Sequence, residues 1–125
     1  MTESLQRRLV ECGHDVQAVA CGEPWPDVGR QVGTAVAAGD ADVGIVCCWT
    51  GTGVSIAANK VSGVRAALCT DAETARGARR WNDANALGLR LTTGSLGAEI
   101  VDAFISTEPD GTETDNIAAV EQHAT

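Results

Sequence analysis

Four short apolar runs, separated by amphipathic or glycine-punctuated segments, constrain the fold of this chain more than any other feature. They cover residues 16–21, 41–48, 64–69 and 84–91. The second run reads ADVGIVCC, and a continuous apolar stretch of this kind is typical of a strand that is covered on both faces. We therefore predict four short strands.

Helical patterns lie before, between and after these runs. Apolar side chains recur at helical spacing in residues 3–12, 27–38, 72–81 and 96–106. The stretch GTGVSIAANK, which starts at Gly51, turns from a loop into a further helix. Since each strand would be followed by a helix, this order predicts an open parallel α/β sheet. Ligands of such sheets bind beyond the carboxyl ends of the strands, where the loop after Cys48 would lie.

The division of the chain follows its composition. Residues 1–106 are expected to form one domain, since 125 residues amount to about one domain's length. Residues 107–125 form an acidic C-terminal tail. We expect a mobile linker over 107–116 and, after it, at most a frayed turn of helix.

The charge and the cysteines exclude several classes of partner. The formal net charge is −8, and a strongly acidic chain repels nucleic acid and anionic membranes. No apolar run approaches the roughly 20 residues of a membrane span. The five cysteines follow no secretory signal and form no paired CxxC pattern, so we expect free thiols, a cytoplasmic location and no metal site.

The loop within CCWTGTGVSIAANK carries the chemistry that the residues themselves offer. It is not a P-loop, because Lys60 is followed by valine, and it is not a dinucleotide fingerprint, because Ile56 replaces the third glycine. A glycine loop that leads into a helix still exposes several N–H groups to a phosphate or a developing oxyanion. Beside them Cys48 would have a lowered pKa and act as a nucleophile or base.

By spacing alone, a second interpretation of Cys48 stays open, namely a small buried residue that ends a strand. Cys47 points to the opposite face if both residues are still on the strand, and we expect it to be a core residue. The histidines, His14 in a turn and His123 in the tail, are not expected to take part in catalysis.

The stretch from Cys48 to Asn85 resembles the signature region of the ribose-5-phosphate isomerase B and galactose-6-phosphate isomerase family. It reads CWTGTGVSIAANKVSGVRAALCTDAETARGARRWNDAN, against a family form close to CGTGxGxSIAANK followed by HNDAN. The preceding stretch PWPDVGRQVGTAVAAGDADVGIV resembles the family segment in which a Pro-Asp pair opens a helix. The resemblance covers roughly residues 5–106.

This resemblance implies a Rossmann-like three-layer α/β sandwich and a homodimer or tetramer with its sites at the subunit interface. It implies interconversion of an aldose phosphate and a ketose phosphate, most simply ribose 5-phosphate and ribulose 5-phosphate, without metal or cofactor. Cys48 stands where the family has its base, and Thr50 and Asn82 stand at substrate-contacting positions. The amides that would hold the enediolate oxygen belong to Gly51, Thr52, Gly53, Val54 and Ser55.

The chain also departs from the family pattern. The family begins with a central strand that ends in an Asp-His pair, whereas this chain starts on the helix after it, so the first family strand is expected to be missing. Trp81 replaces the family's ring-opening histidine, and Trp49 replaces a glycine beside the base. Both tryptophans are candidates for a substrate-binding apolar wall, and filling a subunit interface is the other interpretation.

The phosphate ligands are the fourth departure, because no lysine or arginine follows Arg90. Arg90 is therefore a candidate phosphate ligand, with Arg79 and Arg80 as others unless they only form a solvated helix face. A sugar-phosphate isomerase is the function that we expect. The alternatives are a non-catalytic or partner-dependent sugar-phosphate-binding subunit, and a thiol enzyme with other chemistry.

Overall fold

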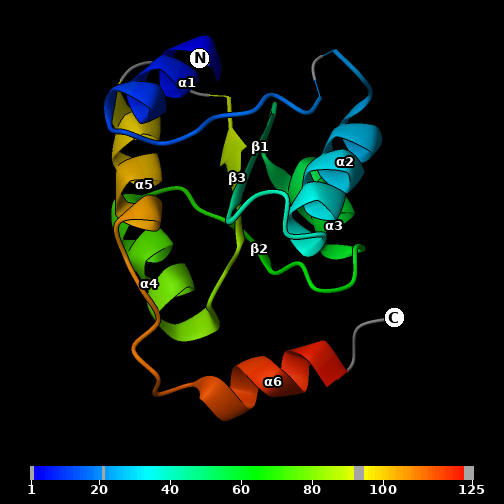
Figure 1. Cartoon of the computed structure of the whole chain (residues 1–125), viewed down its shortest axis with the longest axis vertical. Coiled ribbons are helices and arrows are strands. Elements are labelled where there is room, and N and C mark those ends of the chain that lie inside the picture. The colour runs from blue at the N-terminus through cyan, green and yellow to red at the C-terminus, as the bar shows by residue number, and fades with distance from the viewer. Residues whose placement is uncertain (1, 21, 92–94, 123–125) are drawn as a thin grey trace.

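The computed structural model describes residues 2–20, 22–91 and 95–122 as a parallel sheet between two layers of helices (Figure 1). The strands are β1 (Gly44–Cys48), β2 (Ala66–Leu68) and β3 (Ala86–Arg90), in the order β1-β3-β2. The helices are α1 (Thr2–Glu11), α2 (Trp25–Ala37), α3 (Thr52–Asn59), α4 (Ala72–Asn82), α5 (Ser95–Ile105) and α6 (Thr114–Gln122). The predicted open parallel α/β sheet is therefore confirmed.

The connections place helices on both faces of the sheet. The chain crosses from β1 through α3 to β2, and then returns through α4 to the central strand β3. Because such crossovers are right-handed, the outward and the return connection lie on opposite faces. α2 packs on α3 on one face, and α4 packs beside α5 on the other, with α1 against α5 (Figure 1).

The larger core cluster lies between the sheet and the layer formed by α4 and α5. Leu87 and Leu89 of β3 are at most 2% exposed, and they share this cluster with Ile100 and Phe104 of α5. Cys47 of β1 packs against the same cluster, which confirms it as a core residue. The apolar face of α5 thus covers the middle of the sheet.

On the opposite face, α2 and α3 approach each other closely because a glycine stands at their contact. A Cβ on Gly29 would lie 2.6 Å from the Cβ of Ala57 and 2.6 Å from the carbonyl oxygen of Val54. The two helices therefore touch with no side chain from Gly29 between them, and α3 contributes the methyl group of Ala57 to the contact. This contact holds α3, and with it the loop that precedes α3, in a fixed position against α2.

One of the four predicted strands is wrong. Residues 16–20 have no regular secondary structure, and Cys21 lies outside the described residues. Among the described strands β1 lies at an edge of the sheet and pairs only with β3, so the run at 16–20 does not extend the hydrogen-bond ladder. Val16 still packs against the larger core cluster. Residues 17–19 are exposed, so the apolar pattern of the run does not report burial, and a periodicity cannot show whether a strand partner is present.

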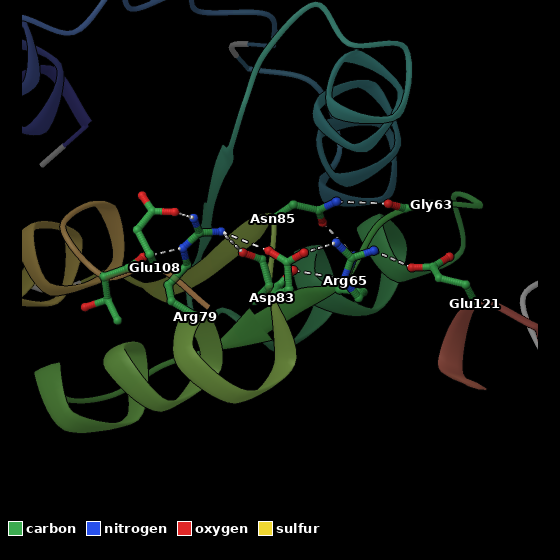
Figure 2. Close-up of polar contacts among 9 residues, drawn as sticks. Gly63, Arg65, Arg79, Asp83, Asn85, Glu108 and Glu121 are labelled. Atoms are coloured by element: carbon green, nitrogen blue, oxygen red, sulfur yellow. Dashed lines mark hydrogen bonds and ion pairs between the residues drawn. The ribbon is translucent and has the colours of Figure 1, made fainter. Parts of the chain in front are cut away.

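The tail is more helical than predicted. Residues 107–110 lack regular structure as expected, but α6 begins at Thr114, so residues 114–116 belong to a nine-residue helix. No residue of α6 is buried. The helix is tied to the rest of the chain by Glu121, which forms an ion pair with Arg65, the residue before β2 (Figure 2).

A polar network closes the amino edge of the sheet, and Arg65 lies at its centre (Figure 2). Its Nε donates to the carbonyl oxygen of Asp83 at 2.9 Å, and its backbone N–H donates to Oδ1 of Asn85 at 2.7 Å. Nδ2 of Asn85 in turn donates to the carbonyl oxygen of Gly63 at 2.9 Å. These bonds satisfy backbone groups where β2 and β3 begin.

Arg79 has a structural role at the same edge, which contradicts its candidacy as a phosphate ligand. Its side chain is 12% exposed. Nε donates to the carbonyl oxygen of Thr107 at 3.0 Å, and Nη1 donates to that of Ala84 at 2.6 Å. The guanidinium also lies 5.3 Å from the ring centroid of Phe104. Since its donors are engaged, Arg79 is not available to a ligand.

Candidate active site

The loop between β1 and α3 crosses the carboxyl edge of the sheet, and Gly51 makes this path possible. Gly51 has φ +79°, which favours glycine, and caps the amino end of α3. A Cβ there would lie 2.6 Å from Cδ1 of Leu68 and within 2.8 Å of the backbone of Leu89 and Arg90. The loop therefore lies directly on the ends of β2 and β3.

Ser55, on α3, holds this loop through a side-chain hydrogen bond. Its side chain is buried, and its hydroxyl donates to the carbonyl oxygen of Gly51 at 2.7 Å. A Cβ on Gly88 would lie only 1.8 Å from the hydroxyl oxygen, so Gly88 provides the space that Ser55 occupies. Ser55 thus acts through its side chain on the shape of the loop, in addition to the amide role expected from the sequence.

Cys48, the last residue of β1, lies at the mouth of this loop, with its thiol in reach of the loop amides. Burial raises the pKa of the thiol, but hydrogen bonds from the backbone N–H groups of Val54, Gly51, Thr50 and Gly53 outweigh it and lower the pKa below its usual value. Four donors around one sulfur stabilise a thiolate. Once the thiolate has taken up a proton, the same N–H groups can stabilise the negative charge of a substrate oxyanion next to the sulfur.

Cys47, which is half-buried, and Cys69, which is buried, lie in a different environment from Cys48. Burial raises the pKa of Cys47 to about 11, with the neighbouring Cys48 as a second cause. Burial likewise raises the pKa of Cys69 to about 11. Cys12 is exposed and follows α1, so it does not belong to the β1–α3 loop. The surroundings of Cys47 and Cys69 thus disfavour a thiolate, whereas those of Cys48 favour it.

The two loop threonines bind each other. The hydroxyl oxygens of Thr50 and Thr52 lie 2.7 Å apart, and the backbone N–H of Thr52 donates to the hydroxyl of Thr50 at 3.4 Å. The amide of Thr52 is therefore directed at Thr50, whereas the amides of Gly51 and Gly53, on either side of Thr52, donate to the sulfur of Cys48. A substrate contact of the Thr50 hydroxyl stays a prediction.

Arg90 lies beside Cys48 on the neighbouring strand. The two residues are register partners in the β1–β3 pair. Gly88, two residues earlier on β3, faces Ser55 of α3, so the Arg90 side chain leaves the strand on the α3 face, towards the loop. Arg90 is exposed, and its side chain forms no hydrogen bond or ion pair with another described residue. Its position agrees with the predicted role as a phosphate ligand.

Trp25 is a neighbour of the loop that the sequence did not reveal. A Cβ on Gly53 would lie 2.9 Å from Cε3 and 3.0 Å from Cδ2 of its indole, so the ring rests on Gly53. Trp25 is the first residue of α2, which begins two residues before the helix predicted over 27–38. The available signal was an aromatic residue held between two prolines at the start of a helix. Trp49 is also close to Cys48, as its chain neighbour, and is 80% exposed.

Trp81 and Asn82 do not lie beside Cys48 of the same chain. They end α4, which runs from the carboxyl end of β2 to the amino end of β3. The next residue, Asp83, bonds to Arg65 in the network at the amino edge. Trp81 is 49% exposed, and the Arg80 guanidinium lies 5.7 Å from its ring centroid. One chain therefore places the two halves of the predicted site at opposite edges of the sheet.

Within residues 2–20, 22–91 and 95–122, no group of three or more His, Cys, Asp or Glu side chains is arranged to hold a metal ion. In the same part of the chain, no helix combines the length and the apolar character that crossing a membrane requires. His123 lies outside the described residues.

The sequence of this chain is similar to those of known proteins. A family model described as Ribose/Galactose Isomerase matches residues 1–120. Ribose-5-phosphate isomerase B of Escherichia coli K12 is 40% identical over 104 residues, which are 78% of this chain and 70% of that protein. D-erythrulose-4-phosphate isomerase of Pectobacterium atrosepticum is 42% identical over 89 residues, which are 70% of this chain and 59% of that protein.

A solved structure shows the same fold. Ribose-5-phosphate isomerase B of Clostridium thermocellum superimposes with a TM-score of 0.91 at 36% sequence identity. The superposition covers 96% of this chain and 86% of that chain.

Proposed function

This chain belongs to the ribose/galactose isomerase family and is a sugar-phosphate isomerase, and we propose that it interconverts an aldose phosphate and the matching ketose phosphate with Cys48 as the base. The observation that carries this proposal is the thiol of Cys48 at the carboxyl edge of the sheet, with its pKa lowered by four loop amides. Ribose 5-phosphate and ribulose 5-phosphate are the first pair to test, since a relative with that activity in its name covers most of the chain.

The mechanism follows from the loop. The Cys48 thiolate removes the proton from C2 of the open-chain aldose, and the C1 carbonyl oxygen gains the negative charge of an enediolate. Amides of residues 50–54 that face the thiolate stabilise this charge. The Cys48 thiol then returns the proton to C1, the proton of the C2 hydroxyl moves to the C1 oxygen, and a carbonyl forms at C2. Each step conserves protons and electrons, and no redox partner is required.

Arg90 would hold the phosphate group. Its guanidinium lies on the strand next to Cys48 and has no partner among the described residues, and its side chain emerges on the face of the loop. Among the arginines considered from the sequence, Arg79 is engaged by backbone carbonyls, and Arg80 stacks on Trp81 at the other edge.

A second copy of the chain would complete the site. Trp81 and Asn82 lie at the edge opposite Cys48, so they can contact the same substrate only if they belong to another subunit. Trp49 and Trp81 are 80% and 49% exposed, and exposed aromatic residues of this size are typical of subunit interfaces. A homodimer or tetramer with shared sites satisfies both observations.

A coupled assay of ribulose 5-phosphate formation from ribose 5-phosphate tests this proposal. Cys48→Ala is expected to lower kcat/KM by about a thousandfold or more, because it removes the base. Cys47→Ala is the matched control, since that thiol packs in the core and should leave kcat/KM within a few-fold. The acid limb of kcat/KM should fall below the pKa of an ordinary thiol, because the thiolate is the active form. Full activity of Cys48→Ala would exclude the mechanism.

The second candidate is a partner-dependent sugar-phosphate-binding subunit. It is favoured by the acidic tail and by the absence of any lysine or arginine after Arg90, which leave few cations for a phosphate. Turnover by the purified chain alone would exclude this function. Activity that appears only after a second subunit of the family is added would support it.

A further inference from the structure

We propose that Trp25 forms an apolar wall of the substrate site, on which the carbon-bound hydrogens of the sugar phosphate stack. This inference rests on the proposed function and adds a substrate-binding residue to it. The resulting site takes an open-chain sugar phosphate between an aromatic ring and a thiolate.

The contact with Gly53 places the indole at the site. The six-membered part of the ring approaches Gly53 so closely that a Cβ there would lie 2.9 Å, 3.0 Å and 3.2 Å from Cε3, Cδ2 and Cζ3. The N–H of Gly53 is one of the groups that lower the pKa of Cys48. The ring therefore rests on the backbone that faces the thiolate, with no side chain between them.

The ring is both accessible and fixed. It is 51% exposed, so the part that does not touch Gly53 faces outward. Pro24 has φ −56° and ψ 146° and precedes the helix, and Pro26 follows in its first turn, so the backbone on either side of Trp25 is restricted. Gly29, one turn further on, holds α2 in contact with α3 (Figure 1). A fixed aromatic ring loses little conformational entropy when a ligand covers it.

The chemistry of the ligand matches such a surface. A sugar phosphate presents C–H groups as well as hydroxyl groups, and an indole offers a large apolar face with one N–H donor at its edge. Stacking would also exclude water from the enediolate. Inorganic phosphate has no C–H group, so its binding should not depend on Trp25. This difference separates a carbohydrate-binding wall from a general effect on the loop.

Steady-state kinetics of Trp25→Ala, Trp25→Phe and the control Val10→Ala test the proposal. Trp25→Ala should raise KM about tenfold with kcat within about threefold, because the contact exists in both the ground state and the transition state. Trp25→Phe should restore KM to within about threefold, and Val10, 59% exposed on α1, should have no effect. The inhibition constant of inorganic phosphate and the pH profile should not change.

A merely structural Trp25 gives a different result. If the ring only shapes the loop, Trp25→Ala would lower kcat and shift the acid limb of the pH profile. It would also raise the inhibition constant of inorganic phosphate. If the ring is instead an interface residue, the sedimentation coefficient of the variant would fall. Either outcome overturns the proposal.

Gly53→Ala supplies an independent test, because its Cβ would displace the indole without deleting it. It should raise KM in the parent chain but have no further effect on KM in the Trp25→Ala background. Additive effects in the double variant would show that the two residues act separately, and would contradict the wall.

Fluorescence separates this inference from the proposed function. In a Cys48→Ala, Trp49→Phe, Trp81→Phe variant, Trp25 is the remaining tryptophan. Ribose 5-phosphate and erythrose 4-phosphate are the probes. If a probe changes the Trp25 emission but the parent chain is inactive, Trp25 binds the sugar phosphate as proposed and the isomerase mechanism is rejected. An active parent chain whose Trp25 emission responds to neither probe would reject the wall.

Discussion

The two edges of the parallel sheet use their polar groups differently. At the amino edge, Arg65 and Arg79 are bonded to carbonyls and carboxylates, and their side chains are 19% and 12% exposed (Figure 2). At the carboxyl edge, Arg90 has no described partner, and the loop amides converge on the thiol of Cys48. Polar groups that are hydrogen-bonded within the chain, as at the amino edge, stabilise the fold. The amides that face only the sulfur of Cys48 remain able to bind a ligand.

This comparison predicts that a change at one edge affects activity and a change at the other affects stability. Gly51→Ala should have the largest effect at the carboxyl edge. Its φ of +79° and the contacts of a Cβ with Leu68 and the backbone of Leu89 would force the loop to move. We expect kcat/KM to fall by about a hundredfold or more, since the oxyanion donors would be displaced.

The measurement for Gly51→Ala pairs the coupled assay with the rate at which iodoacetamide alkylates Cys48 at neutral pH. The alkylation rate should fall as well, because fewer amides would stabilise the thiolate. Gly39→Ala is the matched control, with φ +82° but no atom within 4 Å of its Cβ. If Gly51→Ala kept its activity and its alkylation rate, the loop amides would not be the oxyanion donors.

Arg79→Met should have the largest effect at the amino edge. It removes donors to the carbonyl oxygens of Thr107 and Ala84 and leaves both acceptors unpaired. We expect the free energy of unfolding to fall by about 2–4 kcal/mol. Urea denaturation measures this change, and Arg79→Lys should recover part of it.

The same variant sharpens the comparison of the edges. Alkylation of Cys48 in the folded Arg79→Met chain should proceed at the parent rate. A changed rate would mean that the two edges are coupled through the sheet.

Arg90→Ala should have an intermediate effect, on binding alone. We expect KM to rise about tenfold and the inhibition constant of inorganic phosphate to rise in parallel, because one charge-assisted phosphate contact is lost. Arg90 is exposed and unpaired among the described residues, so the urea midpoint should stay the same. Arg7→Ala, an exposed arginine of α1, is the matched control. Unchanged phosphate inhibition would remove Arg90 from the site.

Glu121→Gln should have the smallest effect. It breaks the ion pair between α6 and Arg65, but Arg65 keeps its bond to the Asp83 carbonyl. A partly exposed ion pair contributes little, so the free energy of unfolding should fall by about 1 kcal/mol or less. Urea denaturation beside Glu99→Gln, an exposed glutamate of α5, gives the comparison. A loss several times larger would show that α6 stabilises the whole sheet.

The sequence correctly predicted those helices and strands whose local pattern agrees with the way they pack in the folded chain. The run that ends at Cys48 is β1, and the glycines after it form the loop that leads into α3. The run at 16–20 has a similar pattern but no strand, because a strand also needs a neighbour to bond with. Residues 114–116 were placed in a linker on composition, although they begin α6.

For the site, the residues adjacent in the chain were predictable and those brought together by packing were not. Cys48 and the amides of residues 50–54 follow from a motif, since a strand, a glycine loop and a helix fix each other's geometry. The position of Trp25 at the loop was not predictable, because its contact with Gly53 depends on how α2 packs on α3. The distance between Asn82 and Cys48 was equally hidden, because it depends on the direction in which α4 crosses the sheet.

The sequence by itself determined the alternation of strands and helices from β1 to α5, the thiol at the loop and the family. These depend on side-chain periodicity and on residues close together in the chain. Only the tertiary structure decided that Arg79 is structural, that Arg90 lies beside Cys48, and that Trp25 covers Gly53. Each of these depends on contacts between residues far apart in the chain, and local propensity carries no information about them.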